Sequence, residues 1–139
     1  MAELHAQENI VLQRLEVTFL SELQQQLRLA GYHVFHYMGH GAFDEQAGNG
    51  LLVLEEGAGC SLLVTGQVLG TLLYNEARLR LAILNACEGV RGSHDSAFTG
   101  TAQTLVKKGI PAVVAMQAPI TDGAAKILAH EFYLALADG

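Results

Sequence analysis

Three short runs of apolar residues constrain the fold of this chain more than any other feature of its sequence. The runs cover residues 32–37, 79–84 and 110–116, and stretches with helical spacing separate them. Strands that are apolar at successive positions are typical of sheets buried on both faces, where helices supply the cover. Parallel strands need long crossovers, and the gaps between these runs are long enough to hold helices. The sequence therefore predicts an α/β fold, arranged as a three-layer α/β/α sandwich with a mostly parallel sheet.

The other elements follow from periodicity and from turn residues. Thr18 and Thr65 are expected N-caps, and Gly109 is expected to end a helix. Residues 51–64 carry a Gly-Ala-Gly turn between two apolar segments, which predicts a small β-hairpin. We predict a first strand over 10–17, and helices over 19–30, 65–75, 97–108 and 122–137.

The composition excludes several classes of function. The 139 residues suit a single domain, and 50% of them are hydrophobic, which is typical of a globular chain. A net charge of −6 with only 8 scattered Lys and Arg argues against a nucleic-acid surface, because neutralising phosphates takes clustered cations. No apolar run approaches the ~20 residues of a membrane span, and the N-terminus lacks a signal-peptide pattern. Two cysteines suit a reducing compartment, so we expect a cytoplasmic protein without nucleic-acid or membrane partners.

A histidine and a cysteine each follow one of the predicted strands. His40 lies between Gly39 and Gly41, and Cys87 comes just after the second apolar run. The carboxyl ends of parallel strands share one edge of the sheet, so we expect both side chains at the same rim. A thiolate is a strong nucleophile, and an imidazole is suited to give a proton to a leaving amine near neutral pH. The backbone N–H groups of Gly41 and Cys87 are the candidate donors to an oxyanion.

Each of these residues also has a plainer interpretation. An isolated cysteine after a buried strand is most often a small core residue, and a histidine in a turn is most often solvated. A third interpretation is zinc ligation by His36 and His40 with His94, Cys87 or Cys60. A His-x-x-x-His pair converges on a metal when it lies on a helix, whereas His36 falls in a predicted strand. We therefore expect no metal or cofactor, and a structural hydrogen bond for His36.

The chain contains, in this order, the segments 34–41, 79–87, 109–116 and Thr121-Asp122 with Phe132-Tyr133. This order of segments resembles the CHAT domain family. That family is caspase-like and is grouped with separases, caspases and gingipains among the cysteine peptidases. His40 and Cys87 are 47 positions apart, which resembles the roughly 50-residue spacing of the same residue types in caspases. The resemblance runs from about residue 10 to the end of the sequence.

The resemblance implies a caspase-like fold with a His/Cys dyad. In such a dyad, His40 is the general acid/base and Cys87 is the nucleophile, and no Asp or Asn completes a triad. The two side chains need not touch, because the scissile carbonyl lies between them.

The resemblance also implies where a substrate side chain binds. The turn after the third strand, with Met116 and Gln117, lines the pocket for the residue that precedes the cleaved bond, and Asp122 lies nearby. Acidic residues at the same rim suit a basic substrate side chain. These residues are Asp44, Glu45 and Asp95.

Two functions are compatible with these features. The first is a caspase-like cysteine endopeptidase that cleaves a protein or peptide substrate. The second is a catalytically silent CHAT module that acts as a regulatory or docking domain of a longer signalling protein. Family members normally continue beyond a segment like 135–139 and often lie beside helical repeats, so we expect a C-terminally truncated fragment whose partner is a helical-repeat segment or protein. Loops at 42–50 and 88–97 are expected to border the site.

Overall fold

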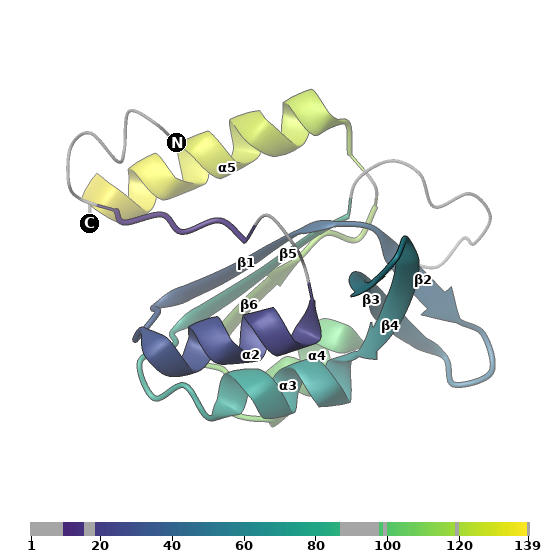
Figure 1. Cartoon of the computed structure of the whole chain (residues 1–139). Coiled ribbons are helices and arrows are strands. Elements are labelled where there is room, and N and C mark those ends of the chain that lie inside the picture. The colour runs from purple at the N-terminus through teal and green to yellow at the C-terminus, as the bar shows by residue number, and fades with distance from the viewer. Residues whose placement is uncertain (1–9, 16–18, 87–97, 99, 119, 139) are drawn as a thin grey trace.

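The computed structural model describes residues 10–15, 19–86, 98, 100–118 and 120–138 of the chain. Figure 1 shows helices and strands that follow one another in mixed order. They are α2 (Leu20–Leu29), β1 (Val34–Gly39), β2 (Gly41–Asp44), β3 (Asn49–Gly57), β4 (Cys60–Thr65), α3 (Gly66–Tyr74), β5 (Leu81–Ala86), α4 (Thr101–Lys107), β6 (Ala112–Ala115) and α5 (Asp122–Asp138).

The strands form two sheets. β1, β5 and β6 form a parallel sheet in the order β1-β5-β6, which confirms the predicted parallel arrangement of the three apolar runs. β2, β3 and β4 form a small antiparallel sheet in chain order, and β3 with β4 is the predicted hairpin. Its turn uses positive φ angles of 48° at Ala58 and 78° at Gly59. His40, the residue between β1 and β2, joins the two sheets.

Helices cover both faces of the parallel sheet. On one face, α2, α3 and α4 pack in a core around fully buried leucines, among them Leu84 and Leu105. On the other face, Ala129 and Tyr133 of α5 pack against Ile83. Figure 1 shows α5 on the opposite side of the sheet from the other three helices. The chain is therefore an α/β protein in which the central strand β5 turns alternate side chains to two cores.

The four predicted helices are confirmed, with ends that differ from prediction by a few residues. The hydroxyl of Thr65 accepts a hydrogen bond from the Val68 N–H at 3.2 Å, which makes it the predicted N-cap of α3. Gly109 follows α4 with a φ of 103°, a conformation that side chains disfavour. α4 itself begins at Thr101, later than the spacing predicts.

The predicted first strand is wrong over the part of it that the structure describes. Residues 10–15 form no helix or strand, and residues 16–18, with the predicted cap Thr18, lie outside the described residues. α2 begins after Phe19, which supplies no side-chain cap. The apolar residues at 10–15 alternate too weakly to specify a strand without a neighbouring edge to pair with.

The segment 42–50, expected as a loop, instead forms β2 and the first residues of β3. Its turn is closed locally, because the carboxylate of Asp44 accepts hydrogen bonds from the N–H groups of Gln46 and Ala47 at 3.0 and 3.1 Å. Gly48 completes the turn with a φ of 64°. The second expected loop, 88–97, lies outside the described residues.

Candidate active site

The register between β1 and β5 determines where the candidate residues leave the sheet. The two strands pair from Val34 opposite Leu81 to Gly39 opposite Ala86. His40 comes one residue after Gly39, and Cys87 comes one residue after Ala86. Cys87 itself lies outside the described residues. The predicted adjacency of the two strands is thus confirmed, and they end at the same level of the sheet.

The backbone of His40 is held by two hydrogen bonds to its carbonyl oxygen. One comes from the Val53 N–H at 3.0 Å and the other from the Tyr37 hydroxyl at 2.7 Å. The first bond joins the parallel sheet to β3 of the antiparallel sheet. The side chain of His40 is exposed. The result is a fixed main chain that presents its imidazole to solvent.

Gly39 is required by the path of the Tyr37 side chain. The buried Tyr37 ring turns back over Gly39, so that its hydroxyl lies 2.7 Å from the His40 oxygen and 2.8 Å from the Val53 oxygen. A Cβ atom at Gly39 would lie 2.6 Å from the Tyr37 hydroxyl oxygen and 2.8 Å from its Cζ. Those distances are shorter than any ordinary contact. The glycine before His40 therefore provides the close approach that the sequence indicates.

The N–H of Gly41 takes no part in the β2–β3 ladder. Gly41 lies opposite Leu52, and the neighbouring bond runs from the Val53 N–H to the His40 oxygen. That pattern makes Gly41 and Leu52 a non-hydrogen-bonded pair, in which each N–H points away from the other strand. The candidate oxyanion donor is consequently directed away from β3.

The predicted pocket residues lie at the end of β6, on the far side of β5 from His40. The N–H of Met116 donates to the Leu84 oxygen at 2.9 Å, which extends the pairing of β6 with β5 by one step. Gln117 follows in an exposed turn. Asp122 is exposed in the first turn of α5 and lies 3.4 Å from the Lys126 ammonium. Asp95 lies outside the described residues.

A partly buried polar cluster, which the sequence indicates only in part, lies below this rim. Nδ1 of His36 is 2.9 Å from the Tyr133 hydroxyl, and Nε2 is 3.1 Å from the side-chain nitrogen of Asn85. Asn85 and Tyr133 are 2% and 5% exposed. The expected structural hydrogen bond of His36 is thus confirmed. The only signal for Asn85 in the sequence is a lone amide at the end of an apolar strand.

Burial shifts the protonation equilibria of this cluster. Loss of solvent lowers the pKa of His36 from its ordinary value of 6.5, which favours the neutral imidazole. The same effect raises the pKa of Tyr133 to about 12, so its hydroxyl stays protonated. Two neutral groups therefore face each other between β1 and α5.

The comparison with protein families gives a match over the full length of the sequence. A family model for the CHAT domain matches residues 1–139, the whole chain. The chain belongs to the CHAT domain family. This membership agrees with a caspase-like domain and with the segments on which the resemblance rests. Comparisons of this chain with curated proteins and with solved structures gave no match.

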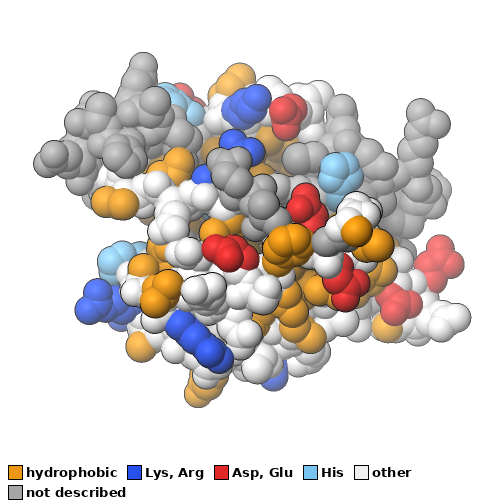
Figure 2. Space-filling model, in the orientation of Figure 1, with side chains coloured by type: hydrophobic (Ala, Val, Ile, Leu, Met, Phe, Trp, Pro, Cys, Tyr) orange, Lys and Arg blue, Asp and Glu red, His pale blue; other side chains and the backbone are white. Residues whose placement is uncertain are grey.

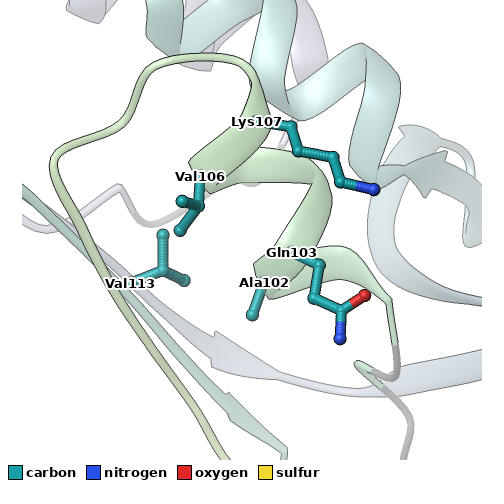
Figure 3. A pocket seen from close by; sticks show the side chains of 5 residues that line it. All are labelled: Ala102, Gln103, Val106, Lys107 and Val113. Carbon is teal, nitrogen blue, oxygen red and sulfur yellow. The ribbon is translucent and has the colours of Figure 1, made fainter.

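The CHAT domain also has a hollow of about 350 Å³ on its surface, between α4 and β6. Figure 3 shows the side chains that line it, which are Ala102, Gln103, Val106, Lys107 and Val113. None of the candidate site residues is among them. The hollow is therefore separate from the rim that carries His40.

Two further properties concern the described part of the CHAT domain only. Within it, no three His, Cys, Asp or Glu side chains come together in a way that would hold a metal ion. None of its helices combines the length and the apolar character needed to cross a membrane.

Proposed function

We propose that this CHAT domain is a caspase-like cysteine endopeptidase, with Cys87 as nucleophile and His40 as general acid/base. The observation that carries the proposal is the strand register, because Gly39 and Ala86 are paired and each precedes one of the two residues. Helices on both faces of the parallel sheet support the finer assignment to a caspase-like three-layer sandwich.

Covalent geometry limits how far apart the two residues can lie. Paired Cα atoms on neighbouring strands are about 4.8 Å apart, and one trans peptide adds about 3.8 Å on each side. Two residues that directly follow such a pair can have their Cα atoms at most roughly 12 Å apart. A histidine and a cysteine within that limit are close enough to act on one peptide group.

The proposed reaction has two steps. The Cys87 thiolate attacks the substrate carbonyl carbon, a C–S bond forms, and the oxyanion is stabilised by the N–H groups of Gly41 and Cys87. His40 then protonates the leaving amine as the C–N bond breaks, which leaves a thioester. Water attacks the thioester, with His40 accepting its proton, and the product acid and the thiolate are released.

The anchoring of His40 supports this role. A general acid must be positioned before the reaction, because reorienting it would add to the barrier. The hydrogen bonds from Val53 and Tyr37 fix the main chain of His40, and the imidazole is left exposed to a substrate. The orientation of the Gly41 N–H away from β3 supports its role as an oxyanion donor.

We propose a protein or peptide substrate with a basic side chain before the cleaved bond. Exposed acidic side chains lie at both ends of the antiparallel sheet, at the right of Figure 2. Glu45, Glu55 and Glu56 are exposed, whereas the Asp44 carboxylate is engaged in its own turn. Met116 and Gln117 would contact the substrate from the β6 side. Because these charges are exposed, the preference should weaken as salt is added.

The test is covalent labelling with a panel of peptidyl chloromethyl and acyloxymethyl ketones that differ in the residue before the reactive group. The full-length protein is used, with its partner present. We expect Cys87 to be labelled, most rapidly by probes with a basic residue, and His40→Ala to abolish the labelling. Cys60 is exposed and is the reference thiol, and Cys60→Ser is the control. Equal labelling of both cysteines, or none, would instead favour the catalytically silent docking module.

A further inference from the structure

We propose that His36 is a positioning residue for the candidate active site. It orients Asn85 on β5, two residues before Cys87, through hydrogen bonds that begin at Tyr133 of α5. The inference rests on the proposed function, since it concerns the positioning of the nucleophile named there.

The cluster connects three elements on one face of the sheet. In the register, His36 lies opposite Ile83, and Asn85 lies one pair of same-face residues further toward the carboxyl end. The contact from Nε2 of His36 to the Asn85 amide therefore runs diagonally from β1 to β5. Tyr133 approaches from α5, and its ring lies 5.7 Å from the His36 ring. The imidazole of His36 on β1 thus connects the end of β5 to α5.

The hydrogen bonds define the tautomer of His36. The Asn85 amide nitrogen donates to Nε2, so Nε2 carries a lone pair. A neutral imidazole then bears its proton on Nδ1, where it donates to the Tyr133 oxygen. Tyr133 stabilises this tautomer from α5, because its hydroxyl oxygen accepts the proton of Nδ1. If His36 were protonated, Nε2 would also carry a proton, and its N–H would face the N–H of the Asn85 amide.

Asn85 retains a buried polar atom without a hydrogen bond. Its side-chain oxygen is inaccessible to solvent and has no hydrogen-bond partner within the described part of the chain. A buried unsatisfied oxygen costs free energy, whereas an apolar side chain of similar volume would not. The amide is therefore poorly suited to stability alone. We infer that its role is to hold the end of β5, two residues before Cys87, in one orientation.

Successive residues of β1 hold the two halves of the site from opposite faces. Tyr37 binds the His40 carbonyl from the face covered by α2, α3 and α4. His36 binds Asn85 from the face covered by α5. One strand in this way fixes both the general acid and the end of the strand that carries the nucleophile.

The first test measures how fast Cys87 is alkylated by iodoacetamide relative to Cys60, in the full-length protein, by mass spectrometry. Cys60 is exposed on the hairpin and serves as an internal reference. We expect Asn85→Ala and His36→Phe to lower the Cys87 to Cys60 ratio at least fivefold, and Tyr133→Phe to lower it about twofold. With a cleavable peptide, kcat should fall by about the same factors while KM stays within twofold.

Ile83→Val is the matched control. Ile83 is 5% exposed on the same strand and the same face, and its shortening loosens the packing of α5 without touching the polar cluster. It should lower the melting temperature and leave both the alkylation ratio and kcat unchanged. If Asn85→Ala and His36→Phe behave like Ile83→Val, the positioning role is wrong. If those two variants fail to fold, Tyr133→Phe decides, and an unchanged ratio there contradicts the proposal.

The second test reads the tautomer directly. Ring ¹⁵N spectra should show His36 with its proton on Nδ1, and Tyr133→Phe should shift the population toward the Nε2 form. A wild-type ring protonated on Nε2 would overturn the proposed direction of the hydrogen bonds. The two proposals also fail separately. If the protein cleaves no peptide but the variants lose Cys87 alkylation, the endopeptidase is contradicted and the positioning role is supported. If the protein cleaves peptides and the variants keep Cys87 alkylation, the endopeptidase is supported and the positioning role is contradicted.

Discussion

The Tyr37 hydroxyl lies 2.7 Å from the carbonyl oxygen of His40, three residues further along the chain. The same hydroxyl lies 2.8 Å from the carbonyl oxygen of Val53 on β3. One buried side chain thus connects the exit of the parallel sheet to the antiparallel sheet, at the residue proposed as general acid. The geometry around His40 depends on this contact.

Tyr37→Phe removes the hydroxyl and keeps the ring. We expect the free energy of unfolding to fall by about 1 kcal/mol, because a buried hydrogen bond is lost and the carbonyl oxygens lose a donor. We also expect kcat to fall while KM changes little, since His40 loses one of its two anchors. Urea denaturation and peptide cleavage measure the two effects. Tyr74→Phe, at a tyrosine that is 65% exposed, is the control and should change neither.

Gly39→Ala tests whether the glycine is needed for the Tyr37 ring. The new Cβ would meet the Tyr37 hydroxyl at 2.6 Å, so the ring must move away from His40. We expect destabilisation by about 1–3 kcal/mol, as in other overpacked sites. In contrast, Gly123→Ala should be neutral or stabilising by up to about 1 kcal/mol, since nothing lies within 4 Å and alanine favours the helix. A Gly39→Ala protein as stable as wild type would contradict the close approach.

The sequence predicts the parallel sheet because its strands are buried on both faces, and that burial produces continuous apolar runs. It predicts the start of α3 because a threonine cap is a local feature. β2 is missed for the opposite reason. Its four residues have no periodicity of their own, and they form a strand only because β3 offers an edge and Asp44 closes the turn.

The polar cluster shows where sequence reasoning ends. His36 and Tyr133 are 97 positions apart, and no local pattern indicates that their side chains meet. Gly39 could be predicted only in part. A glycine at this position suggests that another group comes close to the backbone, but only the structure identifies that group as the Tyr37 ring. Long-range pairs of this kind depend on the packing of whole elements rather than on spacing along the chain.

Thr65→Ala should weaken the start of α3. The hydroxyl of Thr65 satisfies the N–H of Val68 at 3.2 Å, and this N–H would otherwise have no partner within the helix. We expect the free energy of unfolding to fall by about 1 kcal/mol. Thr65→Ser keeps the oxygen and should stay within a few tenths of a kcal/mol, since serine caps a helix at least as well as threonine. Thermal or urea denaturation of the two variants provides the measurement, and equal losses would show that the cap does not contribute.

His36 should make stability depend on pH in the weakly acidic range. Its pKa is lowered in the folded protein by burial, so the unfolded chain, with a pKa near 6.5, binds more protons as the pH falls. The free energy of unfolding should therefore decrease as the pH drops through about 6.5, and this part of the decrease ends once the folded-state pKa is passed.

His36→Phe should remove that part of the pH dependence, because phenylalanine keeps the ring shape but does not titrate. His33→Asn is the control, since His33 is exposed and lies outside the cluster. Urea denaturation between pH 8 and pH 5 gives the slopes for the three proteins. We expect the His36→Phe curve to be flatter than wild type and the His33→Asn curve to follow wild type. If all three slopes are the same, the half-buried imidazole of His36 does not limit acid stability, and its protonation is not coupled to unfolding.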